Sequence, residues 1–350
     1  MSPLQQAVTG GFAIGVAFGA LGLLVGFCLT RGLRNWLVDG DGIKIRTFAL
    51  ALAVAVVGAQ GIEGLGLVSY GRSLYLQGAV SWPLLVIGGA TFGYGMVLAN
   101  GCGSRALVLL GSGNLRSFVV LVCIGLAGYA VLAGVLAPLR VMASDVSTVP
   151  VGVVPPTLAG LVSTWGLGDA VARWLPMVVV ATVLAAFALG SRPFRRSRGD
   201  VIGGILIGLL IPLGWLATGY LGSDDFEPVP VASLTFVAPV GSTLQYMMLS
   251  TGMALSFGVA AVLGVVAGSA VTAVLSGRFR LEAFSSPGHM LRSITGGTLM
   301  GIGGALAMGC SIGQGLTGMS TLALSSIAAF ASILAGAAIA LRGPLRVRGM

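Results

Sequence analysis

The sequence predicts an all-α integral membrane protein that crosses the bilayer about nine times. Of its 350 residues, 56% are hydrophobic and only 8% are charged, whereas soluble domains carry roughly 25% charged residues. The 57 glycines suit helices that pack against one another in lipid, where small residues let backbones approach closely. We therefore expect the lipid bilayer to be the main partner. We do not expect nucleic acid, although the formal net charge is +9.

A membrane-spanning helix needs about 20 mostly apolar residues. Nine segments meet this requirement: 8–30, 48–69, 79–101, 116–137, 174–190, 201–221, 244–275, 294–312 and 321–341. The apolar stretch 157–173 carries Asp169 and Arg173 four residues apart, which predicts an interfacial helix rather than a tenth crossing. No basic residue precedes the first apolar run and no small-residue cleavage site closes it. We expect that run to be retained as a span and not removed as a signal peptide.

Basic residues are concentrated in alternate loops. If the N-terminus lies outside, the inward-facing loops hold 16 of the 19 Lys and Arg residues, and the outward loop 222–243 is acidic, with Asp224, Asp225 and Glu227. Loops rich in Lys and Arg stay on the cytoplasmic side. The sequence therefore predicts a multi-pass protein of the bacterial inner membrane with its N-terminus outside and its C-terminus in the cytoplasm.

Two Gly-Cys segments resemble each other across the chain. TFGYGMVLANGCGSR at 91–105 aligns with LMGIGGALAMGCSIG at 299–313, so that Cys310 follows Cys102 by 208 residues, and a weaker match pairs 22–32 with 208–219. We interpret the chain as a single transmembrane domain over 1–350. It has a first repeat at about 8–137, linking helices at about 157–190 and a second repeat at about 201–341. One linking span inverts the second repeat, and inverted-repeat transporters place their substrate near the membrane midplane.

Glycines surround both repeated cysteines, and each glycine weakens a helix by about 1 kcal/mol relative to alanine. These glycines are Gly101 and Gly103 beside Cys102, and Gly309 and Gly313 beside Cys310. We predict short re-entrant helices there, because irregular backbone at membrane depth is tolerated only where protein buries it or where it lines a cavity. Their exposed N–H groups would face an anion. Alternatively, the glycines only allow close helix packing. A substrate site is favoured because both copies of the motif have a cysteine at the same place.

Four motifs of the chain resemble the YeeE/YedE family of sulfur-compound transporters. They are GFCLTRGLRNW (26–36), NGCGSRALVLLGSGNLRS (100–117), GLLIPLGWLATGYLGSDDFEP (208–228) and MGCSIGQGLTGMSTLA (308–323). The resemblance implies a compact hourglass-shaped bundle whose narrow centre is lined by Cys28, Cys102 and Cys310. It also implies a small sulfur-containing anion as substrate, since the best understood members import thiosulfate, although some members of the family are tied to selenium metabolism. Family habit further suggests a small cytosolic sulfur-carrier protein as partner, docked on the inner arginines Arg195, Arg196, Arg198, Arg346 and Arg348.

We expect the substrate path to contain the three cysteines together with Gly101, Gly103, Gly309, Ser311, Gly313, Gln314, Arg105 and Glu63. Arg105 either collects or discharges the anion at the inner mouth or extends to the interface. Glu63 is the only acid well inside a predicted span. It either couples protons to transport or caps backbone groups near the outer interface. Cys123 matches no motif and is expected to be an ordinary buried thiol, and His289 is expected at the surface.

The cysteine spacing bears on the rival classes of function. The four cysteines form no CxxC pair and have no neighbouring histidine pair, so we expect neither a metal site nor a cofactor. A membrane thiol-disulfide redox protein would exchange electrons through a close cysteine pair with a lowered pKa, which the spacing does not reveal. A structural or signalling subunit would not need a repeat centred on cysteines. The sequence thus predicts a transporter and not an enzyme, with redox chemistry or a related sulfur or selenium species as alternatives.

Overall fold

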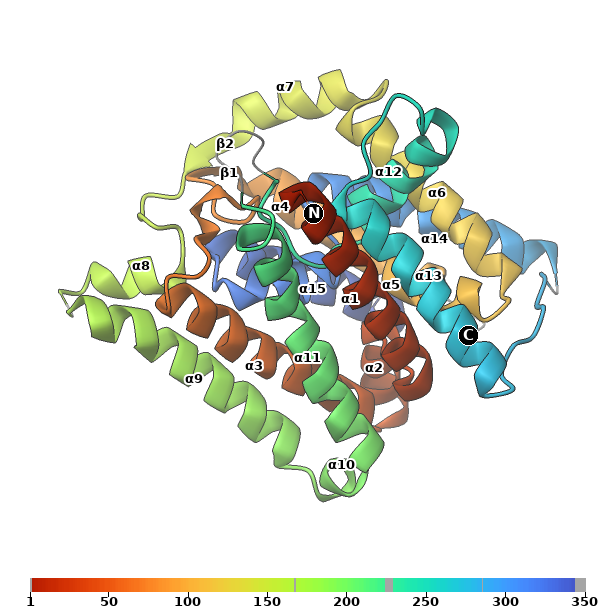
Figure 1. Ribbon diagram of the computed structural model, residues 1–350, viewed down its shortest axis with the longest axis horizontal. Coiled ribbons are helices and arrows are strands. Elements are labelled where there is room, and N and C mark those ends of the chain that lie inside the picture. The colour runs from red at the N-terminus through yellow and green to blue at the C-terminus, as the bar shows by residue number, and fades with distance from the viewer. Residues whose placement is uncertain (1, 167, 224–228, 285, 344–350) are drawn as a thin grey trace.

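The computed structural model describes residues 2–166, 168–223, 229–284 and 286–343, and nearly all regular structure in these ranges is helical (Figure 1). Eight helical segments among them have the length and apolar composition to cross a membrane: Pro3–Asp39, Ile43–Gly64, Trp82–Gly111, Leu115–Leu132, Ala170–Leu189, Arg198–Gly219, Phe257–Leu275 and Leu324–Arg342. The predicted all-α, multi-pass membrane protein is confirmed. Asp224, Asp225, Glu227, Arg346 and Arg348 lie outside the described residues.

Two predicted segments have different boundaries in the structure. The span predicted at 244–275 is wrong, because two helices occupy it, α12 (Val237–Leu249) and α13 (Phe257–Leu275). The Ser256 hydroxyl accepts a hydrogen bond from the Val259 N–H and so begins a new helix. The segment predicted at 294–312 corresponds to α14 (Pro287–Leu306), which is not among the eight candidate spans of the described chain.

The interfacial helix predicted at 157–173 is also wrong. Only α8 (Leu158–Ser163) lies there, and Asp169 begins the long helix α9 (Asp169–Leu189). The Thr157 side chain accepts from the Gly160 N–H and starts α8, and Gly166 has a left-handed conformation with φ of 75°. A turn at this glycine therefore separates the two helices.

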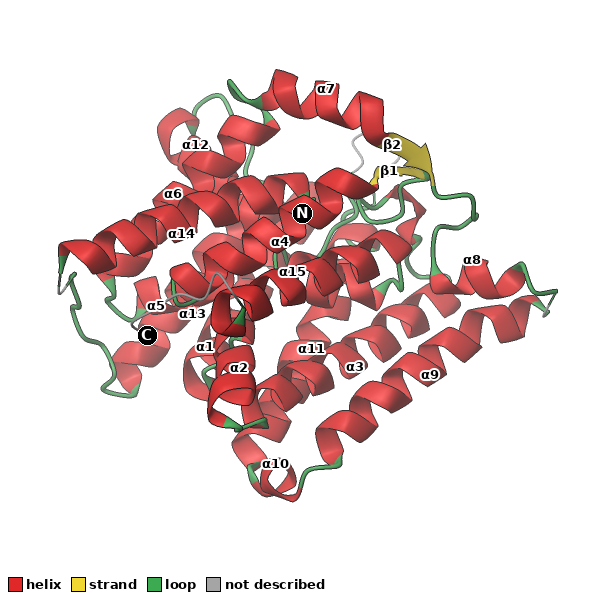
Figure 2. Cartoon of the chain, turned by 180° about the vertical axis from the view of Figure 1, so that it is seen from behind, coloured by secondary structure: helices red, strands yellow, loops and turns green. Residues whose placement is uncertain are grey.

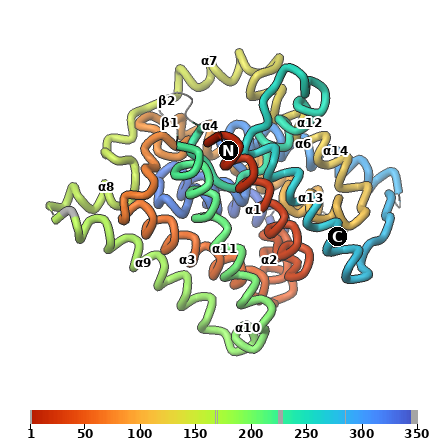
Figure 3. Tube along the Cα trace, in the orientation of Figure 1, coloured from red at the N-terminus to blue at the C-terminus, as the bar shows by residue number. Residues whose placement is uncertain are grey.

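The long helices form two groups joined by a central pair. On one side α3 (Ile43–Gly64) packs against α9 and against α11 (Arg198–Gly219). On the other side α14 packs against α4 (Trp82–Leu98) and α6 (Leu115–Leu132), and α15 (Leu324–Arg342) packs against α4. Between the groups α1 (Pro3–Val25) runs along α13 (Figures 1 and 3).

The contact between α1 and α13 is made through glycines on both helices. A Cβ atom added to Gly19 would strike the Val265 carbonyl oxygen of α13, and one added to Gly268 would strike the Val16 carbonyl oxygen of α1. The backbones of the two helices therefore touch directly, which is the close approach that small residues permit in membranes.

A small peripheral layer was not predicted from the sequence. Strand β1 (Ala79–Ser81) pairs antiparallel with β2 (Thr148–Pro150) (Figure 2), and α7 (Ala137–Ser147) lies across one end of the bundle. A short helix, α10 (Arg192–Arg196), joins α9 to α11, and a single turn, η2 (Tyr70–Arg72), follows α3. The remaining short helices are those that follow the three cysteines.

Candidate functional site

Each of the three cysteines singled out from the sequence lies where one helix stops and a short one begins. Cys28 follows the end of α1 and immediately precedes α2 (Leu29–Arg34), which continues into η1 (Asn35–Asp39). Cys102 lies between α4 and α5 (Gly103–Gly111), and Cys310 lies between α14 and η3 (Gly313–Gly318). Helix is therefore interrupted at both Gly-Cys motifs and at the motif that contains Cys28.

The two Gly-Cys turns share an unusual backbone conformation. Asn100 and Met308 have φ of 56° and 54°, a left-handed conformation that is uncommon for residues other than glycine. Each is followed by a glycine whose N–H donates to a carbonyl of the preceding helix, Gly101 to Met96 at 2.9 Å and Gly309 to Gly304 at 2.8 Å. Asn100 and Met308 are 208 positions apart, and so are Gly101 and Gly309, as the two cysteines are. The turn that ends α4 is thus made again at the end of α14.

The three cysteine side chains are buried in one region of the molecule. Cys102 is 1% exposed, and its sulfur lies 3.2 Å from the Ser104 hydroxyl. The Cys102 thiol also interacts with the Cys28 thiol. It faces the Ser311 hydroxyl as well, but these two groups do not have the geometry of a hydrogen bond. The structure thus brings the Cys28 and Cys102 thiols near enough to interact, which the spacing in the sequence did not reveal.

Cys310 is buried beside this pair. Its sulfur accepts from the Gly313 N–H at 3.3 Å and lies 4.0 Å from the Thr235 hydroxyl, and it is near enough to Cys102 to interact with it electrostatically. A Cβ atom added to Gly313 would strike the Thr235 hydroxyl. A side chain at position 313 would therefore displace Thr235.

Buried polar atoms without a hydrogen-bond partner gather around the cysteines. Among the described residues, the side chains with such an atom are those of Thr30, Ser73, Arg105, Ser311, Gln314 and Ser326. Four of these six lie within four positions of Cys28, Cys102 or Cys310 along the chain: Thr30, Arg105, Ser311 and Gln314. Since buried polar groups in proteins are nearly always hydrogen-bonded, these four groups have capacity for a further polar species.

Arg105 and Gln314 both turn polar atoms toward the interior. Arg105 lies in the first turn of α5, one of its guanidinium nitrogens is fully buried, and its charge acts on Cys28. Gln314 donates through Nε2 to the Ala307 carbonyl at 2.6 Å and leaves Oε1 without a partner. Gly309 packs against the Gln314 side chain. Gly103 opens α5 directly after Cys102.

Three further residues of this region were missed in the sequence. Ser104 belongs to a quoted motif, but Thr235 and Tyr75 come from connecting segments outside every motif. Burial, and then the neighbouring Cys310, raise the pKa of Tyr75, whose hydroxyl accepts from Thr235. No pattern of spacing or composition marks Thr235 or Tyr75, because only the tertiary fold brings them to Cys310.

The other residues considered from the sequence lie apart from the cysteines. Glu63 is half-buried in the last turn of α3, where it is near Arg173 of α9 and its carboxylate accepts from the Tyr70 N–H. Cys123 is half-buried on α6 beside Thr298. His289 is exposed and lines a cavity.

The described part of the chain shows four free cysteines and no group of three or more His, Cys, Asp or Glu residues that could hold a metal ion. The arrangement is a set of thiol and hydroxyl donors together with the partly buried Arg105 guanidinium. Such a set offers hydrogen bonds and positive charge to an anion.

Comparisons with known proteins agree with a transport role. A family model described as sulphur transport matches residues 26–339. The thiosulfate transporter TsuA of Escherichia coli is 29% identical over 305 residues, which cover 83% of this chain and 81% of that protein. The thiosulfate transporter TsuA of Spirochaeta thermophila is 27% identical over 330 residues, 90% of this chain and 92% of that protein. The relatives are transporters and not enzymes, as was expected for this chain, and the chain belongs to the sulphur transport family.

Proposed function

We propose that this protein carries thiosulfate into the bacterial cell through a constriction formed at Cys28, Cys102 and Cys310. Two relatives that are similar over most of the chain are named thiosulfate transporters. The observation that carries the proposal is the set of buried, unpartnered polar atoms beside the three cysteines, contributed by Thr30, Arg105, Ser311 and Gln314. A polar species that passes between the cysteines would supply the hydrogen bonds that these atoms lack.

The chemistry of thiosulfate suits such a path. Thiosulfate is a dianion with a polarizable terminal sulfur, and an unpaired ion in an apolar interior is strongly unfavourable. The path must therefore replace the water that the ion loses. Thiols are weak donors, and weak binding has a use here because a conduit must release the ion as readily as it admits it. The Arg105 guanidinium compensates charge from the edge of the cysteine region, where it acts on Cys28.

The proposal also includes the orientation of the protein in the membrane and an inverted internal repeat. The inner face would be the one that carries 16 of the 19 Lys and Arg residues, with the N-terminus outside. The paired turns at Asn100 and Met308 support two inverted halves around one linking span, in which α14 would have to serve as the fourth span of the second half beside the eight candidate spans of the described residues. In this arrangement the exposed arginines Arg195, Arg196 and Arg198 face the cytosol and would dock a small acidic sulfur-carrier protein. Pull-down of such a carrier should fail when these three arginines are replaced by glutamine, and retention of binding would contradict the docking.

Uptake of labelled thiosulfate into proteoliposomes tests the main proposal. The parent protein should take up thiosulfate faster than protein-free vesicles, and unlabelled thiosulfate should compete more strongly than sulfate because only thiosulfate presents a soft sulfur to the thiols. Competition by selenium analogues in the same assay would identify a related substrate. Vesicles that contain the protein and take up no thiosulfate would refute the proposal.

The interaction between the Cys28 and Cys102 thiols supports one second candidate, a membrane thiol-disulfide protein. A redox role requires that the two thiols form a disulfide and release two electrons and two protons to an acceptor. Mass spectrometry after treatment with an oxidised quinone or with diamide should show whether this bond forms. A Cys28–Cys102 disulfide that is reduced again by a cellular thiol, in a protein without uptake activity, would favour the redox role.

A further inference from the structure

One ion pair joins three helices at the point where α1 ends. Lys44, the second residue of α3, places its ammonium nitrogen 2.6 Å from a carboxylate oxygen of Asp200 in the first turn of α11. The same nitrogen donates to the Val25 carbonyl at 2.7 Å. Val25 is the last residue of α1 and lies three positions before Cys28. The contact that ties α3 to α11 therefore also holds the end of the helix that leads to Cys28.

The surroundings of this ion pair are polar and only partly open to solvent. The Ser197 hydroxyl donates to the second carboxylate oxygen of Asp200 at 2.6 Å, and the Thr47 hydroxyl lies 3.4 Å from the first. The side chains of Lys44 and Asp200 are 21% and 13% exposed. An apolar pair often stabilises such a place as well as an ion pair does, because the charges lose water there. An apolar pair could not donate to the Val25 carbonyl, however, and the last carbonyls of a helix have no partners within it.

The residue type at position 44 fits two acceptors on separate helices. Lys44 is the only lysine among the 19 Lys and Arg residues of the chain. An ammonium group is compact and has three donors, whereas a guanidinium group is a planar fork that suits one carboxylate. The last turn of α1 has no basic residue of its own, although the helix dipole favours a cation there. Lys44 therefore supplies from α3 the cation that the end of α1 lacks.

The turn between α1 and Cys28 is held on its other side by an aromatic contact. Gly26 ends α1 in a left-handed conformation with φ of 66°. The ring of Phe27 then stacks on that of Phe48 in α3, with the ring centres 5.5 Å apart and the planes 15° from parallel. Cys28 follows at once and begins α2. The position of its thiol therefore depends on how firmly the end of α1 is held to α3 and α11.

We propose that Lys44 and Asp200 are positioning residues, which hold the end of α1 and thereby keep the Cys28 thiol beside Cys102. The inference rests on the proposed function, since the position of Cys28 affects uptake only if the anion passes the cysteines. Lys44 contacts the Val25 carbonyl and acts on the path through it, without touching the ion. When this donor is lost, the turn before Cys28 opens more often, because local opening is controlled by the contacts that close it.

Reaction of the thiols with N-ethylmaleimide tests the positioning without any transport. The full-length protein is treated in detergent, and mass spectrometry of its peptides gives the rate at each cysteine. Cys28 is 6% exposed and Cys310 is 1% exposed, so both react only when the structure around them opens. Loss of one charged hydrogen bond in Lys44→Met should raise the rate at Cys28 about ten- to hundredfold and leave the rate at Cys310 unchanged. An unchanged rate at Cys28, or an equal rise at both thiols, would overturn the proposal.

Uptake of labelled thiosulfate shows whether the position of Cys28 is what Lys44 contributes. Lys44→Met should slow uptake about fivefold to a hundredfold, the range for one lost partner of the ion. In a Cys28→Ala background the same change should cause no further loss, because a residue that acts only through Cys28 has nothing left to position. Parental uptake by Lys44→Met, or an added loss in the Cys28→Ala background, contradicts the proposal. If Cys28→Ala itself takes up thiosulfate at the parental rate, the cysteine path is refuted, and the reactivity of Cys28 still decides on Lys44.

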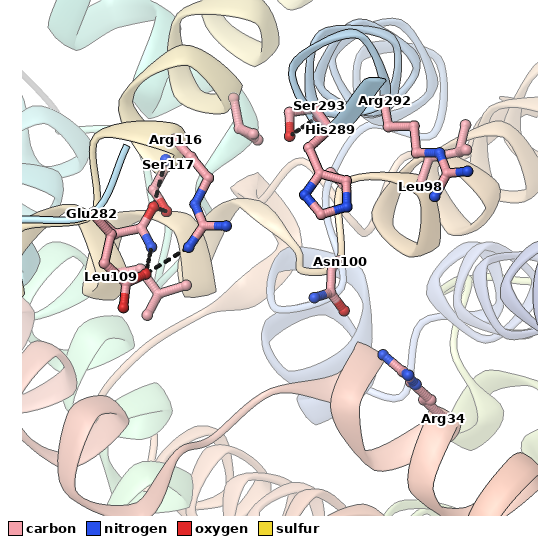
Figure 4. A pocket seen from close by; sticks show the side chains of 13 residues that line it. Arg34, Leu98, Asn100, Leu109, Arg116, Ser117, Glu282, His289, Arg292 and Ser293 are labelled. Atoms are coloured by element: carbon pink, nitrogen blue, oxygen red, sulfur yellow. Dashed lines mark hydrogen bonds and ion pairs between the residues drawn. The ribbon is translucent and has the colours of Figure 1, made fainter. Parts of the chain in front are cut away.

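Arg116→Gln is the matched control. The Arg116–Glu282 pair is the other ion pair in the described part of the chain, with the same distance of 2.6 Å, and it lines the cavity that His289 also lines (Figure 4). It joins the first turn of α6 to Glu282 and not to the end of α1. Arg116→Gln should leave both uptake and the reactivity of Cys28 at parental values. A rise at Cys28 as large as in Lys44→Met would show that any lost ion pair loosens this turn, against the proposal.

A milder variant covers the case in which Lys44→Met does not accumulate in the membrane. Asp200→Asn removes the ion pair and keeps an oxygen acceptor for the Ser197 hydroxyl. It leaves the Val25 carbonyl within reach of Lys44 but frees the ammonium group from α11. We expect a smaller rise in the reactivity of Cys28, of about threefold to tenfold, again with no change at Cys310. Parental reactivity of Cys28 in a folded Asp200→Asn variant would overturn the role of the pair.

Discussion

Replacement of Cys102 by alanine tests the cysteine path most directly. The change removes one sulfur atom that lies 3.2 Å from the Ser104 hydroxyl and that interacts with Cys28. A passing anion would lose one hydrogen-bond partner, which adds about 1–3 kcal/mol to its barrier in a dry constriction. At 1.36 kcal/mol for each factor of ten, uptake should slow about fivefold to more than a hundredfold.

The same substitution should affect folding little. Loss of a group of this size from a buried position lowers the free energy of unfolding by about 0.5–1.5 kcal/mol, as it does for Ile→Val. Uptake of labelled thiosulfate is therefore measured at equal membrane abundance, with thermal unfolding of each variant determined in detergent. Cys28→Ala and Cys310→Ala should behave like Cys102→Ala. Cys→Ser retains a donor, although a harder and more strongly bonding one, and should leave partial activity.

Cys123→Ala is the internal control, because Cys123 lies on α6 beside Thr298 and away from the other three cysteines. It deletes the same atom and should leave uptake unchanged. If Cys102→Ala and Cys310→Ala transport as fast as the parent at equal abundance, these cysteines only fill space and the reasoning is refuted.

Three further predictions concern topology, helix contact and an unpartnered hydroxyl. Cysteines introduced at positions 72 and 196 should be labelled from outside and from inside respectively, and labelling of both from one side would contradict the orientation. Gly19→Ala should lower the free energy of unfolding by about 1–3 kcal/mol because its methyl group would strike α13. Gly61→Ala, which meets open space, should not, as thermal unfolding will show. Ser311→Ala removes a buried hydroxyl without a partner, so stability should hold or rise by up to about 1 kcal/mol while uptake falls, and a loss of stability with normal uptake would contradict this.

Composition and local pattern were sufficient to predict the class of fold. Backbone groups in lipid must be hydrogen-bonded within the protein, and apolar runs of about 20 residues with few charges meet this requirement as helices. The interruptions at Cys102 and Cys310 were also foreseeable, because glycines on either side of each cysteine weaken a continuous helix. What the pattern did not show is the break before α13. The stretch 244–256 is apolar enough to be helical throughout, and a serine cap inside it decided otherwise.

The partners of the cysteines depend on tertiary structure and were largely missed. Thr235 and Tyr75 reach Cys310 from segments that carry no motif, and Cys28 meets Cys102 across 74 positions of the chain. The cavity at Arg34, Arg116 and Arg292 joins residues that in the sequence only indicated topology. A basic residue in a short loop has the same appearance whether it faces solvent or lines a cavity, so its role emerged only from the structure.

The glycine contact between α1 and α13 limits how the protein can move. Each helix belongs to a different predicted half of the chain, and backbone touches backbone at Gly19 and Gly268. A rocking motion that separated the halves would have to break this contact between α1 and α13 along its length. No flexible side chains lie between the two backbones at these glycines to adjust to the motion. Tight interfaces of this kind do not deform gradually. The two halves should therefore stay fixed during a transport cycle, with only short segments near the cysteines adjusting as each ion passes. A covalent cross-link between α1 and α13 should accordingly leave the uptake rate unchanged.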